Sequence, residues 1–399
     1  MNALDTSCTD QLERYARMSE AFGHFHGGEA AFGVRAPGRV DLMGSHTDYN
    51  QGFVMTLPIN REVWILARPR LDGKVRMASL NMESLSGFDA KDPTSRKLTD
   101  WGVYAQGVAV ELHKAGYPLT GCDAVVHGTV PVSSGLSSSA ALEAAVATLF
   151  EQLGGFTLEP VEKAKLTQKA ENAWVGVNCG ILDQYSSILG EQHKTLVLDC
   201  RSLTHQYAAV PRDVQIVICN TNAPRQLSGS EYGDRRAQCE QGAEYFNKID
   251  PAITALRDVS PELFAEHEDE LPVLAARRSR FIIEENERVG ALAAALESSD
   301  RAVIEDLMTA SFEGCRDLFE ISVPAMESMF DAMHSAPGVV GCRQTGAGFG
   351  GCMVAVVDEG SVEDFCDHTA SVYETATGLS PDIYPIRTAP GAGELPRRD

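Results

Sequence analysis

One segment of this chain, GTVPVSSGLSSSAALEAAVA at residues 128–147, constrains its fold more than any other. A short strand ends in a Pro–Val–Ser–Ser–Gly turn, and three serines then lead directly into a helix rich in alanine and leucine. One serine is enough to cap the free N–H groups of a helix start, so five serines with a glycine exceed that need. Gly135 allows the backbone to approach a ligand closely, and the helix dipole favours an anion there. The segment predicts a strand–loop–helix unit, whose loop is either a simple cap or a phosphate site without the lysine of a GxxxxGK[ST] loop.

The net charge limits what such a phosphate ligand can be. The chain has 34 Lys and Arg residues against 56 Asp and Glu residues, which gives a net charge of −22. This charge repels a long polyanion and excludes nucleic acid as a partner, whereas a small nucleotide can still bind through backbone N–H groups. No stretch of about 18 apolar residues occurs, and the N-terminal segment lacks the basic and apolar regions of a signal peptide. We therefore expect a cytoplasmic protein without a membrane partner.

The cysteines do not indicate a metal site. Ten of them are scattered along the chain, none at CxxC spacing and none with histidines at the intervals of a zinc site. Free cysteine is among the most buried residue types. We expect most of these thiols to be buried and reduced.

Strand-like and helical segments follow one another irregularly. Strands are predicted at residues 30–44, 52–70, 74–81, 122–130, 195–200, 214–221 and, interrupted by glycines, 341–360. Helices are predicted at 9–22, 101–115, in the second part of 131–155, at 159–175 and through most of 228–335, with a last helix and strand closing the chain. Because this order is not a regular βαβα alternation, it favours an α+β fold. We place one domain boundary between 1–207 and 208–399, and we expect the tail at 389–399 to be frayed.

A second glycine-rich segment, TGAGFGG at 345–351, matches the pattern GxGxxG. A dinucleotide-binding fingerprint opens a helix near the start of a βαβ unit, whereas this segment precedes the strand-like CMVAVV late in the chain. The segment therefore indicates either a loop that lies against a bound ligand or a tight turn between strands.

Two acidic residues occur in the otherwise apolar stretch at 169–190, KAENAWVGVNCGILDQYSSILG. Glu171 and Asp183 are candidates for a metal ligand or a catalytic base, because carboxylates in apolar surroundings often have such roles. Read alone, each could equally be a solvated helix residue.

The segment GRVDLMGSHTDYNQG at 38–52 holds six consecutive polar residues between apolar stretches. With PVSSGLSSSAALEAA, CGILDQY, SEYGDRRAQCE and TGAGFGGCMVAVV, and in the same order, it resembles the GHMP small-molecule kinases and, among them, the galactokinase family. The resemblance extends over most of the chain. It implies an N-terminal domain with a mixed sheet and helices, a C-terminal α+β sandwich, and an active site in the cleft between them.

The resemblance also implies the reaction and the residues that carry it. Members of the family phosphorylate a sugar, here galactose, at its anomeric hydroxyl with ATP and Mg²⁺, giving galactose 1-phosphate and ADP. Asp183 would be the catalytic carboxylate, and Arg39 would contact it and the transferring phosphoryl group. Ser139 and Glu171 would hold Mg²⁺. The residues implied for ATP binding are Ser134, Gly135, Leu136, Ser137, Ser138, Ser139 and, near the adenine, Trp101.

The polar segment at 45–50 would bind the sugar. By resemblance, Asp48 takes two ring hydroxyls, His46 lies near C6, and Tyr232 lies over the ring. The other residues implied are Asn178, Cys179, Gly180 and Gly346, which would let the backbone approach the substrate. We expect a monomer whose ligands are a small sugar and ATP.

Ser45 departs from the family pattern, in which glutamate usually precedes the histidine. Serine is shorter and uncharged, so a roomier and less negative pocket near C6 is expected. Galactose could still bind, a C6 carboxylate such as that of galacturonate could become acceptable, or another polyol could be the substrate. A non-catalytic sugar sensor is a further alternative, which the intact GLSSSAAL segment and the presence of Glu171 and Asp183 oppose.

Overall fold

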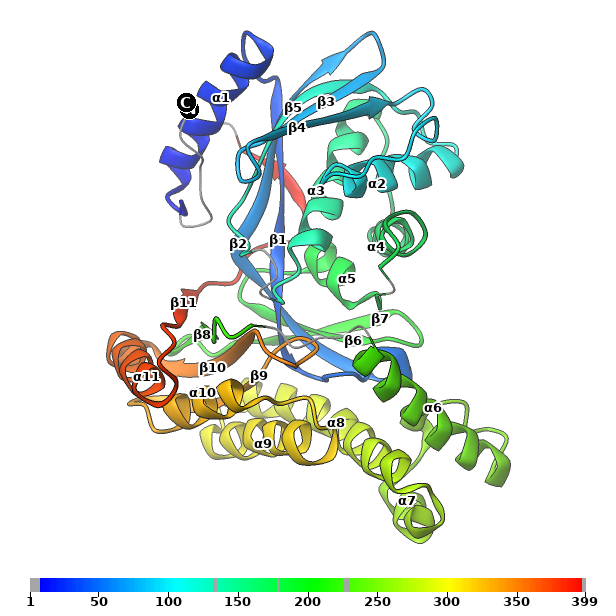
Figure 1. The fold of residues 1–399 in the computed structure, drawn as a ribbon, viewed down its shortest axis with the longest axis vertical. Coiled ribbons are helices and arrows are strands. Elements are labelled where there is room, and N and C mark those ends of the chain that lie inside the picture. Colours follow the sequence, from blue (N-terminus) through cyan, green and yellow to red (C-terminus); the bar gives the residue numbers. More distant parts are fainter. Residues whose placement is uncertain (1–7, 132–134, 178, 225–229, 397–399) are drawn as a thin grey trace. The chain divides into compact units, whose positions relative to one another are not determined.

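A computed structural model of the chain describes residues 8–131, 135–177, 179–224 and 230–396 (Figure 1). The structure divides into two compact units, each with helices and sheet, which confirms the α+β prediction. Unit 1 comprises Met1–Arg39, Pro58–Gln192 and Ala389–Asp399, and unit 2 comprises Val40–Leu57 and His193–Thr388. The units are thus interleaved along the chain, whereas the sequence predicts a single boundary after residue 207. The unit boundaries after Arg39 and after Leu57 fall inside strands β1 (Phe32–Met43) and β2 (Phe53–Arg70). Both strands are apolar on either side of the boundary, so the sequence gives no sign of it.

The sheet of unit 1 has the strand order β12–β1–β2–β5–β3–β4. The strands not yet named are β3 (Lys74–Ser79), β4 (Ser84–Asp89), β5 (Gly121–Gly128) and β12 (Gly393–Leu395). The pairs β12–β1, β2–β5 and β3–β4 are antiparallel, whereas β3 and β5 run parallel. The tail expected to be frayed instead supplies β12, where Leu395 pairs with Gly33 and is only 5% exposed. Leu395 is the single large apolar side chain of this tail, so the sequence has no alternating pattern that would predict the strand.

Helices cover both faces of that sheet (Figure 1). On one face lies α1 (Gln11–His26), whose Met18 and Phe22 pack against Trp64 and Leu66 of β2. The other face carries the remaining helices of unit 1: α2 (Val103–Lys114), α3 (Ser138–Gly154), α4 (Pro160–Ala170) and α5 (Leu182–Leu189), with a π-helical turn at Glu171–Val175. Because both faces are buried, β2 reads as a nearly continuous apolar run.

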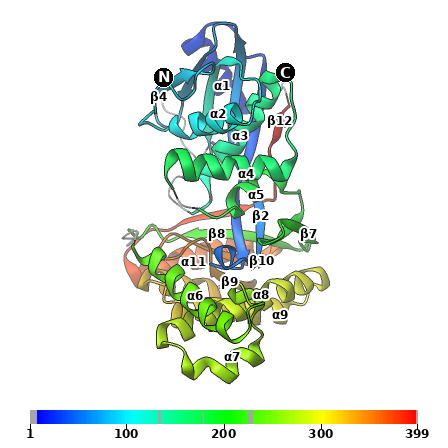
Figure 2. The ribbon, with the colours of Figure 1, turned by 90° about the vertical axis from the view of Figure 1, so that its right-hand side faces the viewer.

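Unit 2 contains the four-stranded antiparallel sheet β11–β8–β10–β9. Its strands are β8 (Val214–Asn220), β9 (Val339–Gln344), β10 (Cys352–Asp358) and β11 (Asp382–Ile386). One face packs against α9 (Arg301–Glu313), α10 (Pro324–His334) and α11 (Val362–Thr377); Figure 2 shows α9 and α11 beside this sheet. Phe312, Phe330 and Phe365 of these helices join a single core with alternate residues of β8 and β10. A hairpin of β6 (Lys194–Asp199) and β7 (Thr204–Ala209) pairs through β6 with Phe53–Thr56 of β2.

The remaining helices of unit 2 form a second core. They are α6 (Ser230–Ile249), α7 (Pro261–His267) and α8 (Val273–Ser298), with short 3₁₀ turns at Leu256–Asp258 and Glu268–Glu270 and a π-helical turn at Gly314–Leu318. A further 3₁₀ turn at Glu359–Ser361 precedes α11. The prediction of a largely helical stretch at 228–335 is confirmed for the residues that the structure describes. Among those residues, no helix has both the length and the apolarity that crossing a membrane requires. All ten cysteines are free and most are buried, as predicted.

Candidate active site

In unit 1, Arg39 connects the predicted catalytic carboxylate with the serine-rich loop. Arg39 lies near the end of β1, and Asp183 lies in the first turn of α5. The Arg39 guanidinium donates from Nη2 and Nε to Oδ1 of Asp183, at 2.6 and 3.0 Å, and from Nη1 to the Gly135 carbonyl oxygen, at 2.5 Å. The Asp183 side chain is 28% exposed, so its second oxygen can reach a substrate. The arrangement places a fixed positive charge between a carboxylate and the predicted phosphate loop.

The serine-rich loop keeps the start of α3 open to an anion. Gly135 has φ +87°, and Ser137, the residue before α3, has φ +60°, a conformation that a non-glycine residue rarely adopts. Within the described residues, the Ser137 hydroxyl caps no N–H group of α3. A β-carbon on Gly38 would lie 2.7 Å from the Leu136 carbonyl oxygen, so only glycine allows β1 to pass this close to the loop. Leu136 itself is buried, and Ser134 lies outside the described residues.

A cavity of about 170 Å³ in unit 1 brings together residues predicted to bind ATP. Ser138 and Ser139 line it from α3, and Trp101 and Tyr104 line it from the segment that opens α2. The Trp101 indole N–H donates to the Ser84 hydroxyl at 3.0 Å, which fixes the ring at the cavity wall. Trp101 therefore lies beside Ser138 and Ser139, and only the resemblance indicated this proximity.

A buried polar cluster surrounds Glu171, the predicted metal ligand. Gln184 Nε2 donates to Oε2 of Glu171 at 2.6 Å and to Oε2 of Glu143 at 3.0 Å, and the Cys179 thiol contacts Glu171 Oε2 at 3.3 Å. Burial raises the pKa of Glu171, and burial together with the neighbouring Glu171 charge raises the pKa of Glu143 well above its usual range. The nearby Ser139 hydroxyl opposes this effect and lowers the pKa of Glu171. Sequence reasoning missed Glu143 and Gln184, because each occurs in a helix without an unusual sequence pattern.

In unit 2, His46 is fixed by protein partners on both ring nitrogens. Nε2 lies 3.0 Å from the Ala347 carbonyl oxygen, and Nδ1 lies 2.9 Å from the Tyr49 hydroxyl. Since a carbonyl only accepts, Nε2 carries the proton, and the Tyr49 hydroxyl donates to Nδ1. The ring also contacts Tyr232 and Phe319, at centroid distances of 5.3 and 4.8 Å. His46 therefore joins the polar segment to the glycine segment at 345–351.

Burial of His46 predicts a dependence of stability on pH. Burial lowers its pKa from 6.5 to about 4, so the unfolded chain binds more protons than the folded one between these values. The free energy of unfolding should fall as the pH drops below about 6.5 and be unaffected by this group above pH 7. Between pH 7 and pH 5 we expect a loss on the order of 2 kcal/mol from His46. Urea unfolding of wild type and His46→Gln at both pH values measures this, and an equal loss in the two proteins would contradict it.

Ser45 is not an open position in the structure. Its side chain is buried, and its hydroxyl accepts a hydrogen bond of 2.6 Å from Nη2 of Arg343, whose side chain is completely buried. The same guanidinium donates to the Ser311 hydroxyl at 3.0 Å and lies 3.3 Å from Oε1 of the buried Glu285. A positive charge balanced by Glu285 therefore lies directly behind Ser45. Neither Arg343 nor Glu285 was singled out from the sequence.

The glycine segment at 345–351 forms the turn between β9 and β10. Gly346 has φ +77°, and Gly348 has φ +82° with the Ile321 carbonyl oxygen 2.6 Å from the position of a β-carbon. The Thr345 hydroxyl accepts a hydrogen bond from the Asp41 N–H at 3.0 Å. Because Ala347 also binds His46, this turn lies beside the polar segment within unit 2.

The other predicted sugar residues divide between the units. Asp48 opens a 3₁₀ turn at Asp48–Asn50 in unit 2, and Tyr232 lies in α6 of the same unit. Cys179 and Gly180 belong to unit 1, where they precede α5 and Asp183. Asn178 lies outside the described residues.

Comparisons with known proteins agree with these features. The model of the GHMP kinases N terminal domain matches residues 103–191, which include the serine-rich loop, Glu171 and Asp183. The galactokinase galactose-binding signature matches residues 20–69, and the GHMP kinases C terminal model matches residues 292–374. These matches define the class of the protein as a GHMP kinase.

Similar whole chains narrow this class. The chain is 40% identical over 380 residues to a galactokinase of Roseiflexus sp. (strain RS-1), covering 95% of this chain and 96% of the relative. The crystal structure of Lactococcus lactis galactokinase complexed with galactose matches with a TM-score of 0.90 and 33% identity, over 96% of this chain and 100% of that one. Methanococcus jannaschii mevalonate kinase, at 16% identity and a TM-score of 0.63 over 91% of this chain and 99% of that one, shares the fold. The chain belongs to the galactokinase family.

Proposed function

We propose that this kinase transfers the terminal phosphoryl group of ATP to the anomeric hydroxyl of galactose, giving galactose 1-phosphate and ADP. The observation that carries the proposal is the Arg39 guanidinium, which binds both Asp183 and the carbonyl oxygen of Gly135 in the serine-rich loop. A single side chain thus links the group that would face the hydroxyl with the loop that would hold the phosphates. The galactokinase relatives and the matching galactose-binding signature support the choice of sugar.

The residues of unit 1 supply the groups that phosphoryl transfer requires. The anomeric oxygen forms a bond to the terminal phosphorus while the bond to the ADP oxygen breaks, and the hydroxyl proton passes to the Asp183 carboxylate. Such a transition state is loose, so positioning and neutralisation of charge contribute most of the catalysis. Arg39 orients Asp183 and stabilises negative charge on the transferred group. The N–H groups at the start of α3 bind phosphate oxygens, and the cavity beside Trp101 takes the base.

The donor set around Glu171 fits Mg²⁺. A carboxylate and the Ser139 hydroxyl are oxygen ligands, and Mg²⁺ usually takes one or two carboxylates and completes its shell with phosphates and water. Within the described residues, no group of three or more His, Cys, Asp or Glu side chains is placed to hold a metal ion. When bound, Mg²⁺ would neutralise phosphate charge, and Gln184 would keep Glu171 oriented toward it.

Since a kinase requires ATP, we place the protein in the cytoplasm.

A second substrate, galacturonate, is favoured by one observation. Ser45, which stands where the family usually carries glutamate, is uncharged and bound by the Arg343 guanidinium, whose charge is balanced by the buried Glu285. A C6 carboxylate would meet no negative side chain at Ser45. Asp48 and Tyr232 would bind either sugar, because both have the galactose ring configuration.

An ADP-release assay separates these functions. It would compare galactose, galacturonate, 2-deoxygalactose, N-acetylgalactosamine and glucose at millimolar concentrations, with wild type and Ser45→Glu. We expect turnover of galactose by wild type, and an increased preference for galactose over galacturonate in Ser45→Glu. The absence of galactose turnover would overturn the main proposal, and turnover of no sugar would favour a sensor. An unchanged preference in Ser45→Glu would show that Ser45 does not lie near C6.

A further inference from the structure

Two consecutive residues of α8 hold the two ends of the polar segment. Glu285 binds the segment where it leaves β1, and Asn286 binds it where it enters β2. We call residues 44–53 the sugar loop, since they connect the two strands and include His46 and Asp48. Neighbouring residues on a helix point in different directions, so one turn of α8 contacts the loop at two separate points.

Glu285 accepts the N–H groups of two successive residues at the start of the loop. Its Oε1 lies 3.0 Å from Gly44 N and 3.2 Å from Ser45 N, and its side chain is completely buried. Burial alone would raise the pKa of Glu285, but the guanidinium groups of Arg343 and Arg288 outweigh this and lower the pKa. The carboxylate therefore stays ionised at neutral pH and makes charge-assisted hydrogen bonds to the loop.

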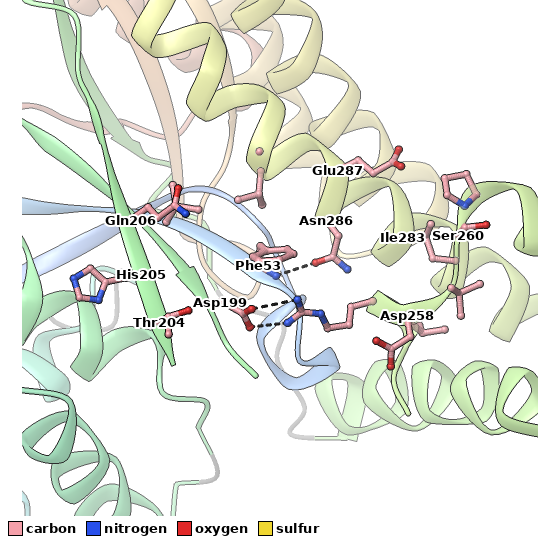
Figure 3. A pocket seen from close by; sticks show the side chains of 17 residues that line it. Phe53, Asp199, Thr204, His205, Gln206, Asp258, Ser260, Ile283, Asn286 and Glu287 are labelled. Carbon is pink, nitrogen blue, oxygen red and sulfur yellow. Dashed lines mark hydrogen bonds and ion pairs between the residues drawn. The ribbon is translucent and has the colours of Figure 1, made fainter. Parts of the chain in front are cut away.

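Asn286 fixes the end of the loop. Its Oδ1 accepts the Phe53 N–H at 2.9 Å, as Figure 3 shows, and a β-carbon on Gly52 would lie 2.2 Å from that oxygen. Arg257 adds a hydrogen bond of 2.7 Å from Nη1 to the Gln51 carbonyl oxygen. The loop end is thus closely packed against the side chain of Asn286.

The surroundings of Asn286 make this contact testable. Asn286 lines a cavity of about 730 Å³ within unit 2, together with Phe53, Asp199 and Glu287 (Figure 3). A side chain at a cavity wall can be exchanged for one of equal size without compressing a core. The loop, in contrast, contains His46 at φ +61° and Gln51 at φ +56°, conformations that persist only where the surroundings enforce them.

We propose that Glu285 and Asn286 are positioning residues that set the conformation of the sugar loop and thereby the affinity for the sugar. The inference rests on the proposed function only for the role of the loop in sugar binding. Without the acceptor of Asn286, the Phe53 N–H loses its partner and the end of the loop is free to move away from α8. The sugar then binds a loop that must first be ordered, which raises KM for the sugar and leaves ATP binding unaffected.

The test compares Asn286→Leu, which has a similar size but no acceptor, with Asn286→Asp, which keeps one. Glu287→Gln, the next residue along α8 and an exposed one, is the matched control. We expect Asn286→Leu to raise KM for galactose about tenfold, with kcat and KM for ATP changed by less than about twofold. Asn286→Asp should recover most of the affinity, and Glu287→Gln should match wild type.

Hydrogen–deuterium exchange of the protein without substrates provides a second readout. We expect faster exchange in peptides that cover residues 44–53 of Asn286→Leu, and unchanged exchange in those of Glu287→Gln. Unchanged loop exchange in Asn286→Leu would overturn the proposal, as would equal losses in kcat and in both KM values. If wild type phosphorylates no sugar, the proposed function fails, whereas the exchange experiment still decides whether α8 holds the loop.

Discussion

Asp183→Asn is expected to lower kcat by about 10²–10⁴ and to change KM for ATP little. The amide has the size of the carboxylate and can still accept a hydrogen bond from Arg39, but it cannot take the hydroxyl proton. It also removes the negative charge that Arg39 binds at 2.6 Å. Steady-state kinetics with saturating sugar and ATP measure the loss.

The thermal unfolding midpoint of Asp183→Asn serves as the control. The side chain of Asp183 is partly exposed, so the variant should unfold within a few degrees of wild type. A kcat within tenfold of wild type would show that Asp183 only orients the sugar. Retained activity would also weaken the assignment of Arg39, whose role depends on the same ion pair.

Glu285→Leu is expected to lower the free energy of unfolding by about 3–5 kcal/mol. The variant leaves the Arg343 guanidinium completely buried without its counter-ion, and removal of one partner of a buried ion pair is far more costly than removal of both. It also leaves the N–H groups of Gly44 and Ser45 without their acceptor. Urea unfolding at pH 7 measures the change.

Two further variants identify the cause of this loss. Glu284→Leu removes the partly exposed partner of Arg288 and should cost less than about 1 kcal/mol. The double variant Glu285→Leu/Arg343→Met removes both buried charges and should be more stable than Glu285→Leu alone. If Glu284→Leu and Glu285→Leu lose equal stability, the buried pair is not what holds this region together.

The strands and helices were predictable where the apolar pattern is long. The helix at the serine-rich loop and the apolar runs of β1 and β2 are examples, since each buries many side chains in a regular pattern. The missed strands, β4, β7 and β12, are short and carry mainly polar residues. Of these, only β12 pairs with a strand distant in sequence, β1, which no local pattern records. β4 and β7 form hairpins with the preceding strands β3 and β6, and their few apolar residues gave no clear alternation.

The glycines, serines and carboxylates of the candidate site could be singled out in the sequence. Which of them lie together could not be predicted from the local sequence alone. The contact between Arg39 and Asp183 joins residues 144 positions apart, so only resemblance to a family indicated it. Glu285 and Asn286 were missed because they occur in a long helical stretch of mixed charge, where a buried glutamate looks like a solvated one. What distinguishes Glu285 is Arg343, and their proximity exists only in the folded chain.

The interleaving of the two units restricts how this enzyme can be taken apart or recombined. A fragment that begins after residue 207 would lack residues 40–57, and with them the whole sugar loop. A fragment that ends at residue 207 would lack β12, which pairs with β1. Chimeras with related kinases should therefore exchange 40–57 together with 193–388, rather than the second half of the gene. A split-protein version would require its break in a surface turn inside one unit.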